Sequence, residues 1–358
     1  MLWLLLALSA LTAYAVTKVS ITFSLRRGVL DIPNPRSSHS EPVPRVGGIG
    51  IAMAFVITLA AFGLMRMLGW VRYPVFTRDV SLLLLGGTGM ALAGLYDDFH
   101  GMRPAVKFLV QFVLAGTIVT LGMRIDHVAI LNWGPFGLGV LTFPLTIFWL
   151  TGFANIFNFM DGINGLAAVT GAAYGSFFFI FAWLEGIPDL AATAVVVVGS
   201  CLGFLFHNFP RARTFMGDTG SLLLGIVLAL LVVRLAQKSA NPASLTGLLL
   251  VCGVYLWDSG FTLMRRVRRR ENIFQAHRSH LYQRLTQVGL SHASITGVYL
   301  SLHILLGLLG VSYVWWANAL RPVVLACAIV ILVGLTLSVY WLEHRPAKGG
   351  PGSAWRNA

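Results

Sequence analysis

The chain has 358 residues, of which 57% are hydrophobic and only 11% are charged. A water-soluble domain typically has about a quarter of its residues charged, so this composition predicts a protein of the lipid bilayer. It excludes a soluble Rossmann or barrel enzyme, a disulfide-stapled secreted module and a disordered tail. Cys201, Cys252 and Cys327 lie in apolar runs, and we expect them to be small core residues that form neither disulfides nor a metal site.

About eleven segments are long and apolar enough to cross a membrane, since a helix needs roughly 20 apolar residues for this. In chain order they are residues 2–25, 46–69, 79–97, 104–122, 140–157, 163–184, 190–206, 220–235, 245–264, 292–315 and 321–342. The first has no charged residue before Lys18, so it lacks the basic start of a cleavable signal peptide and is expected to be retained. The sequence thus predicts an all-α, polytopic membrane helix bundle. We expect one integral membrane domain over residues 1–345 and a flexible tail over residues 346–358.

Basic residues are distributed unevenly between the loops. The chain carries 26 lysines and arginines against 13 acidic residues, a net charge of +13. Most of the basic residues fall in the tail and in the loops after the first, third, fifth, seventh and ninth segments, and cytoplasmic loops are the ones enriched in lysine and arginine. We therefore expect the N-terminus outside the cytoplasm and the C-terminus inside it. Because this orientation explains most of the excess charge, no nucleic-acid partner is expected.

Four aspartates fall at predicted cytoplasmic ends of membrane segments, where a charged side chain suggests a function. Asp97 and Asp98 are adjacent at the end of the third segment, where a helix dipole disfavours negative charge. Two such carboxylates can share a divalent cation, or one can be paired while the other accepts a proton. Solvated helix-end residues are the alternative. Lys107, one turn into the fourth segment, is expected to face the same site and to neutralise a phosphate.

The other two aspartates lie at junctions between helices. In the segment NIFNFMDGINGLA, one carboxylate and three amides recur every three residues: Asn155, Asn158, Asp161 and Asn164. This spacing places them on one side of the turn. Asp218 lies in FMGDTGSLLLG, where the turn offers backbone N–H groups that bind anions at a helix start. Each aspartate could instead be the N-cap of the helix that follows it.

The loop after the ninth segment is the most basic part of the chain. Its first arginines, between residues 265 and 270, are equally consistent with contact to anionic lipid and with ligand binding. His277, Arg278 and His280 suit a diphosphate or a leaving-group oxygen. Asp258 is expected to be a further inward-facing acid. The first cytoplasmic loop contains four possible donors to phosphate: Asn34, Arg36, His39 and Arg45.

Carboxylates, amides, a lysine and a histidine–arginine loop on one membrane face describe a Mg²⁺ site for phosphate chemistry, with Mn²⁺ as a substitute. Mg²⁺ prefers hard oxygen ligands and is held by one or two carboxylates together with substrate phosphates. Phosphoryl transfer needs mainly positioning and charge neutralisation from the protein. A site at the membrane surface further indicates that one substrate is a lipid.

Taken in order, these motifs resemble the polyprenyl-phosphate N-acetylhexosamine-1-phosphate transferases, the relatives of phospho-MurNAc-pentapeptide translocase. The matching segments cover most of the chain: DIPNPRSSH and PRVGG, the Asp97–Asp98 pair with Lys107 and Gln111, NIFNFMDGINGLA, FMGDTGS, Asp258 with the arginines that follow it, and HRSHLYQRL. The last motif is most similar to the branch that initiates O-antigen synthesis.

The resemblance implies transfer of a sugar 1-phosphate from a UDP-N-acetylated sugar to undecaprenyl phosphate, with release of UMP, by an integral transferase of the bacterial inner membrane. It implies that Asp218 is a Mg²⁺ ligand and that Asp97 or Asp98 deprotonates the lipid phosphate or helps to hold the metal. Asn158 and Asp161 would line the nucleotide-sugar pocket. Contacts with the diphosphate or the sugar would come from His277, Arg278 and His280. The expected substrate-binding set is completed by Arg45, Lys107, Asn155 and Asn164.

The chain departs from this family at two positions. Many members carry a second aspartate where this chain has Asn164, so no charged contact is expected there. Others carry histidines where Tyr282 and Gln283 follow His280, and sugar recognition is therefore expected to differ. The alternative interpretation is a transporter or flippase of a lipid-linked sugar, whose site is expected near the bilayer midplane on broken helices. The expected partners are the two substrates, membrane lipids and, in a homodimer, a second copy of the chain.

Overall fold

The structure is a computed structural model that describes residues 1–33, 41–71, 77–272, 275, 277–316 and 318–345. Within these residues the chain is mainly helical. The α-helices are α1 (Leu2–Arg27), α2 (Gly48–Met67), α3 (Arg78–His100), α4 (Pro104–Thr120), α5 (Thr142–Phe159), α6 (Leu166–Leu184), α7 (Pro188–Asn208), α8 (Gly217–Lys238), α9 (Ser244–Val251), α10 (Gly253–Arg268), α11 (Leu281–Gln287), α12 (His292–Trp315) and α13 (Arg321–His344). Two antiparallel hairpins pair β1 (Leu30–Asp31) with β2 (Val43–Pro44) and β3 (His127–Ile130) with β4 (Trp133–Gly137).

The prediction of an all-α polytopic bundle is confirmed. In the described part of the chain, nine helices are long and apolar enough to cross a membrane, and α9 with α10 passes the same test as a pair bent by 72°. The apolar helix α4, with 17 residues, corresponds to the remaining predicted segment. The ninth predicted segment is therefore broken, and α11 lies outside every predicted segment.

Helix α8 is the centre of the bundle. It is buried along nearly its whole length and packs against α2, α3, α5 and α6. Its sequence explains this position, because leucine, valine, isoleucine and alanine occupy all sides of the helix, and a helix that is apolar all round is buried. On another side of the bundle, α1 packs closely on α7. A Cβ at Gly203 of α7 would come within 2.1 Å of the Ala10 carbonyl oxygen, so glycine permits this close approach.

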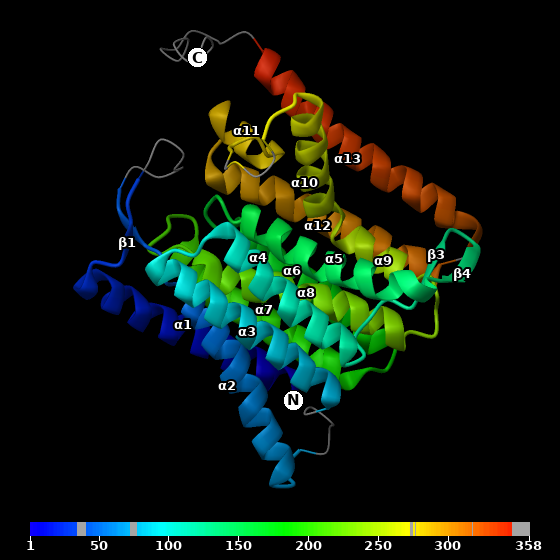
Figure 1. The fold of residues 1–358 in the computed structure, drawn as a ribbon, viewed down its shortest axis with the longest axis horizontal. Coiled ribbons are helices and arrows are strands. Elements are labelled where there is room, and N and C mark those ends of the chain that lie inside the picture. The colour runs from blue at the N-terminus through cyan, green and yellow to red at the C-terminus, as the bar shows by residue number, and fades with distance from the viewer. Residues whose placement is uncertain (34–40, 72–76, 273–274, 276, 317, 346–358) are drawn as a thin grey trace.

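The two hairpins mark opposite ends of the bundle (Figure 1). The β1–β2 hairpin follows the C-terminal end of α1, and the β3–β4 hairpin packs near α9 at the other end. Because consecutive spans alternate in direction, the C-terminal ends of α3, α5 and α7 and the N-terminal ends of α2, α4, α6 and α8 lie at the β1–β2 end. We call this the inner end, since its basic loops predict that it faces the cytoplasm, and the opposite one the outer end.

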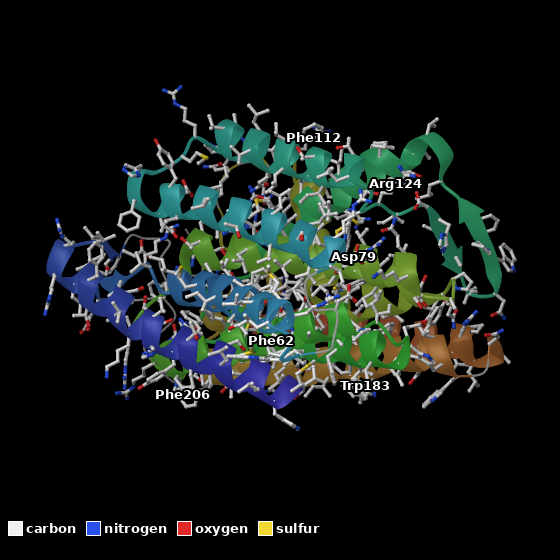
Figure 2. All side chains as sticks on the ribbon, turned by 90° about the horizontal axis from the view of Figure 1, so that it is seen from below. Phe62, Asp79, Phe112, Arg124, Trp183 and Phe206 are labelled. Carbon is white, nitrogen blue, oxygen red and sulfur yellow. The ribbon has the colours of Figure 1, made fainter. Side chains whose placement is uncertain are left out.

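Large apolar side chains cover the outside of the bundle. Phe112, Trp183 and Phe206 point away from its centre (Figure 2), and their exposed fractions are 49%, 60% and 72%. Such a surface is expected of a protein whose surroundings are lipid tails.

The cysteines illustrate the difference between core and lipid faces. Cys201 and Cys252 are buried, as predicted, and neither forms a disulfide. The prediction is wrong for Cys327, which is exposed on α13. An apolar run in a membrane protein surrounds both the core-facing and the lipid-facing side of a helix, so it does not tell which side a small residue occupies.

Candidate active site

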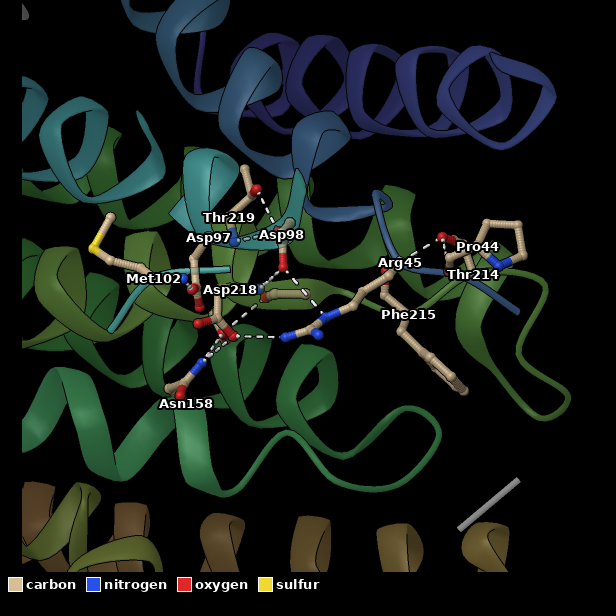
Figure 3. A network of polar contacts seen from close by, with 12 residues as sticks. Pro44, Arg45, Asp97, Asp98, Met102, Asn158, Thr214, Phe215, Asp218 and Thr219 are labelled. Carbon is tan, nitrogen blue, oxygen red and sulfur yellow. Dashed lines mark hydrogen bonds and ion pairs between the residues drawn. The ribbon is translucent and has the colours of Figure 1, made fainter. Parts of the chain in front are cut away.

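Five segments bring charged and amide side chains together at the inner end (Figure 3). They are the turn before α2, the last turn of α3, the first turns of α4 and α8, and the last turn of α5. Their side chains are those of Arg45, Asp97, Asp98, Lys107, Asn158 and Asp218. Carboxylates such as Asp98 and Asp218, which are 120 residues apart in the sequence, therefore meet at one site.

A tight turn after α3 places Lys107 beside the aspartates. Helix α3 ends at His100 and is capped by Gly101, whose φ of 70° favours glycine, and Pro104 begins α4. The backbone amide of Met102 donates to the Asp97 carboxylate and holds the turn. The ammonium of Lys107 then donates to Asp97 at 3.0 Å and also to Asp218, so one cation bridges two carboxylates.

Asp218 accepts contacts from three different helices or loops. Its Oδ1 accepts a hydrogen bond from Asn158 Nδ2 at 3.0 Å and lies 3.4 Å from Nη2 of Arg45, while Oδ2 accepts from Lys107. The side chain is only 9% exposed. Asp218 lies in the first turn of α8 but makes no capping hydrogen bond there, so the N-cap alternative is wrong and the carboxylate points into the site.

Asp98 instead holds the start of α8. Its fully buried carboxylate accepts from the backbone N–H groups of Asp218 and Thr219, each at 2.9 Å, and from the Thr219 hydroxyl at 2.7 Å. The positive end of the α8 dipole and Nε of Arg45, at 3.3 Å, offset the negative charge at the end of α3. These two N–H groups, which the sequence offered as an anion site, are thus bound to the protein's own carboxylate.

Close backbone contact between two glycine-containing motifs positions Arg45. The amide of Gly47 donates to the Phe215 carbonyl at 3.0 Å. A Cβ at Gly48 would lie 2.3 Å from the Gly220 nitrogen, so PRVGG and FMGDTGS need glycine to approach this closely. The glycines of the first loop therefore serve packing against the start of α8.

Asp161 lies in the turn between α5 and α6 and is half-buried. Helix α6 begins at Leu166, and its N-cap residue is Gly165. The alternative of Asp161 as the N-cap of this helix is therefore wrong.

Two charged groups of the site that lie outside the membrane spans have shifted pKa values. Burial raises the pKa of Asp161 well above its ordinary value; the charges of Asp218 and Asp98 act in the same direction and Arg45 acts against them. Burial lowers the pKa of Arg45, but the carboxylates of Asp98 and Asp218 outweigh it and the net shift is upward. Arg45 thus stays a cation, whereas Asp161 is suited to carry a proton at a higher pH than an ordinary carboxyl.

The predicted asparagines differ in what they contact. The amide of Asn155 donates to Gln111 Oε1 at 2.5 Å and joins α5 to α4. Asn164 donates to the Pro210 carbonyl at 3.1 Å, in the loop before α8. Of the three, Asn158 is the one with a hydrogen bond to the carboxylates within the described residues. Substrate contacts of Asn155 and Asn164 remain predictions.

The histidine–arginine loop lies between α10 and α11 and carries His277, Arg278 and His280. Nδ1 of His280 is 3.2 Å from Oδ1 of Asp258, which identifies a partner for this wholly buried acid. Burial, the neighbouring His280 and the arginines of α10 lower the pKa of His277 to about 4, so its imidazole is neutral near pH 7. Just beyond the loop, the Tyr282 hydroxyl at the start of α11 donates to the carbonyl of Phe159, the last residue of α5.

The carboxylates fit a divalent cation that needs few protein ligands. Among the residues that the structure describes, no group of three or more histidine, cysteine, aspartate or glutamate side chains forms a metal cage. Asp97 and Asp218 nevertheless reach a common cation, the ammonium of Lys107. Mg²⁺ is commonly held by one or two carboxylates with substrate phosphates, so this oxygen pair fits it.

Three donors predicted in the first loop, Asn34, Arg36 and His39, lie outside the described residues.

Two hydroxyl residues of the site had no predicted role. The Thr219 hydroxyl donates to Asp98, and the Ser221 hydroxyl accepts from Asn158 at 2.8 Å. Both belong to the FMGDTGS motif, and their position beside Asp218 was the feature of the sequence that could have predicted a role in the site.

Comparison with known proteins shows the family of the chain. The model of the glycosyl transferase family 4 matches residues 80–236. A probable undecaprenyl-phosphate N-acetylglucosaminyl 1-phosphate transferase of Bacillus subtilis is 32% identical over 295 residues, which cover 82% of this chain and 79% of the relative. A decaprenyl-phosphate N-acetylglucosaminephosphotransferase of Mycobacterium tuberculosis is 32% identical over 321 residues, covering 81% and 78%.

A more distant relative is a phospho-N-acetylmuramoyl-pentapeptide-transferase of Halalkalibacterium halodurans, 28% identical over 79% of this chain and 87% of its own. A multi-pass membrane bundle with a carboxylate cluster at one end, together with these relatives, defines a membrane-embedded transferase. The chain belongs to glycosyl transferase family 4, and the resemblance to polyprenyl-phosphate N-acetylhexosamine-1-phosphate transferases is confirmed.

Proposed function

We propose that the protein transfers an N-acetylated sugar 1-phosphate from a UDP-sugar to undecaprenyl phosphate, in a Mg²⁺-dependent reaction that releases UMP. The observation that carries the proposal is the meeting of Asp97, Asp98 and Asp218 with Lys107 and Arg45 at one end of the bundle. Both substrates carry phosphate, and this arrangement combines cations for phosphate with carboxylates for a metal ion or a proton. The family membership supports the reaction class.

The reaction exchanges one phosphorus–oxygen bond for another. An oxygen of the lipid phosphate forms a bond to the sugar-bearing phosphorus of the UDP-sugar, and the bond from that phosphorus to the bridging oxygen breaks, so that UMP leaves with that oxygen. In a two-step route, an aspartate carboxylate would take the sugar phosphate first and the lipid phosphate would then accept it. Both routes use the same residues.

The side chains of the site have distinct roles in this proposal. Asp97 and Asp218 would hold the divalent cation, which supplies charge neutralisation for the diphosphate. Lys107 and Arg45 would bind phosphate oxygens, because both are cations that already contact the carboxylate cluster. Asp98 would position the start of α8, since its oxygens accept three hydrogen bonds there. If Asp218 alone holds the cation, Asp97, which accepts fewer backbone hydrogen bonds than Asp98, is the better candidate to take a proton from the lipid phosphate.

The donor sugar would lie between the carboxylates and the histidine–arginine loop. Asn158 and Asp161 line the turn beside Asp218, and the neutral imidazole of His277 can donate or accept a hydrogen bond without adding charge. We place the reaction at the cytoplasmic face of the bacterial inner membrane, with the N-terminus periplasmic, on the distribution of basic loops. Initiation of O-antigen or another cell-envelope polysaccharide is the pathway that the HRSHLYQRL motif favours.

The proposal is tested by assaying the purified protein in lipid nanodiscs with UDP-GlcNAc, UDP-GalNAc or 6-deoxy N-acetyl UDP-sugars, together with undecaprenyl phosphate. UMP release and the mass of the lipid product are measured with Mg²⁺, with Mn²⁺ and with EDTA. We expect Asp97→Asn and Asp218→Asn to lower kcat by about 100-fold or more, as loss of a metal ligand or proton acceptor does. Asp126→Asn, at an exposed outer-end aspartate, is the matched control and should keep wild-type turnover.

Near-wild-type turnover in both site variants would reject the assigned roles. If the wild-type protein instead moved a sugar lipid across vesicles without forming UMP, the transporter interpretation would replace the transferase.

A further inference from the structure

The segment from His277 to Tyr282 is anchored to the bundle by two sets of contacts in its C-terminal half. It lies between α10 and the first turn of α11 and carries His277, whose imidazole the proposed function places beside the donor substrate. Of its six residues, His280, Leu281 and Tyr282 are buried. A loop held in this way differs from an ordinary surface connection, which is exposed and mobile.

The first anchor is Asp258 of α10. Its wholly buried carboxylate accepts from the backbone N–H groups of Leu281 at 2.8 Å and Tyr282 at 3.2 Å, and from the Tyr299 hydroxyl of α12 at 2.7 Å. His280 Nδ1 is within 3.2 Å of the same carboxylate. Asp258 therefore holds the start of α11 and the orientation of the His280 ring against two neighbouring helices.

The second anchor is the Tyr282 side chain, which reaches across to the end of α5 and the turn that carries Asp161. It is fully buried, stacks on the His280 ring with centroids 5.9 Å apart, and donates its hydroxyl hydrogen to the Phe159 carbonyl at 3.0 Å. A Cβ placed on Gly162 would lie 2.1 Å from this hydroxyl oxygen. The ring thus fits against the backbone on both sides of Asp161.

We propose that Tyr282 is a positioning residue, which locks the 277–282 segment onto the Asp161 turn and so pre-forms the binding surface for the nucleotide sugar. The inference rests on the proposed function, because the segment must contact that substrate. Tyr282 itself does no chemistry. Its hydroxyl donates the hydrogen bond that fixes the ring, and Gly162, which has no side chain, leaves the space that the hydroxyl occupies.

A pre-formed loop affects one kinetic constant more than the other. If the lock is loosened, part of the substrate's binding energy must order the segment, which raises KM for the UDP-sugar. Once the substrate is bound the segment is in place, so kcat changes little, and the lipid substrate is unaffected. A purely structural tyrosine behaves differently: its loss lowers the amount of active protein, and therefore the apparent kcat, while KM stays the same.

The test is Tyr282→Phe, which removes only the hydroxyl. From the loss of one neutral hydrogen bond we expect KM for the UDP-sugar to rise by roughly 3- to 10-fold, with kcat within about 2-fold and KM for undecaprenyl phosphate unchanged. Hydrogen exchange of residues 277–282 should become faster. The matched control is Tyr313→Phe, which removes another buried tyrosine hydroxyl bound to a backbone group, the Leu131 amide, at the outer end; neither effect is expected there.

A double mutant distinguishes the lock from general damage. Gly162→Ala alone should raise KM more than Tyr282→Phe does, because its methyl group clashes with the hydroxyl of a side chain that has no space to move. In the Tyr282→Phe background the hydroxyl is gone and the nearest ring carbon would lie 3.0 Å away, so the same substitution should cost several-fold less.

Additive effects of the two substitutions, or an unchanged KM in Tyr282→Phe, would overturn the inference. The proposed function would still stand if the wild-type protein released UMP. Absence of UMP release from the wild-type protein would count against the proposed function. The exchange rates of residues 277–282 test the lock in either case.

Discussion

Asp161 belongs to the site, and its ionised carboxylate also lowers the stability of the folded protein. Its carboxyl is half-buried near Asp218 and Asp98, and burial with these charges raises its pKa well above the ordinary value. A carboxyl whose pKa is raised on folding contributes stability at a pH below its unfolded-state pKa of about 4, and this contribution is lost as the pH rises through the folded-state pKa. At higher pH, the ionised carboxylate therefore destabilises the folded protein.

Asp161→Asn should for this reason be more thermostable than the wild-type protein at about pH 8, and the gain should shrink as the pH is lowered toward about 4. The same variant should lose about 100-fold or more in kcat if Asp161 takes part in proton transfer. Thermal midpoints across a pH series, with UMP release measured on the same samples, check both statements. A variant that is less stable than the wild type at pH 8 would show that contacts of the carboxylate outweigh its burial.

The sequence predicted which acids meet but not what each contacts. Topology alone brings Asp97, Asp98, Asp161 and Asp218 to the inner end, because the ends of alternating spans share a membrane face. The division between Asp98, which binds the α8 backbone, and Asp218, which faces the site, depends on side-chain directions in the packed bundle. A local pattern contains no information about those directions, and it was equally consistent with N-cap roles that Asp161 and Asp218 do not have.

At the scale of elements, α8 carries charge contacts at both ends of the bundle. At the outer end, Nη2 of Arg234 lies 2.8 Å from Asp79 of α3, and Nζ of Lys238 lies 2.5 Å from the other oxygen of this carboxylate. Lys238 is also 3.5 Å from Asp189 of α7, whose carboxylate accepts from Thr77. This outer network joins α3, α7 and α8 far from the carboxylates of the site.

Arg234→Met should therefore reduce stability without changing the reaction. Asp79 is only 6% exposed and would keep one of its two cations, so we expect a loss of about 1–3 kcal/mol. Turnover per folded molecule should stay at the wild-type value, which thermal unfolding and UMP release would measure together. Arg124→Met breaks an exposed ion pair at the same end and should cost at most about 1 kcal/mol. A fall in turnover per folded molecule in Arg234→Met would reveal coupling between the two ends.

The bend between α9 and α10 is a feature that the apolar pattern of the sequence does not predict. Residues 245–264 read as one apolar segment, yet the chain bends by 72° between α9 and α10, at Cys252 and Gly253, with no proline there. The bend is accompanied by contacts that are remote in sequence, such as those of Asp258 with Tyr299 and with the start of α11. Apolarity predicts that a segment enters lipid, whereas its direction depends on its neighbours.

At the scale of the whole molecule, the bilayer makes the number of spans readable from sequence. Its thickness fixes a minimum apolar length, and ten of the eleven predicted segments meet the length and composition test as single or paired helices within the described residues, with α4 as the short one. The order of helices around α8 and the two hairpins are not readable in this way. They depend on which helix faces pack together, as in the close contact of α1 with glycines of α7.

Orientation in the membrane can be tested with impermeant thiol reagents. In a Cys327→Ser background the remaining cysteines, Cys201 and Cys252, are buried. A cysteine at Trp133, which is 75% exposed in the outer hairpin, should be labelled in intact spheroplasts. One at Arg269, exposed just beyond α10 at the inner end, should be labelled only after permeabilisation.

The physical reason for this expectation is that the basic loops at the inner end prefer the cytoplasmic side. The opposite labelling pattern would place the carboxylates, Lys107 and Arg45 on the outside. UDP-sugars are charged and do not cross the apolar interior of a bilayer unaided. A donor made in the cytoplasm could then not reach the site, so the reversed pattern would contradict the proposed cytoplasmic placement of the reaction. It would do so even if the purified protein released UMP in nanodiscs, where both faces are open to substrate.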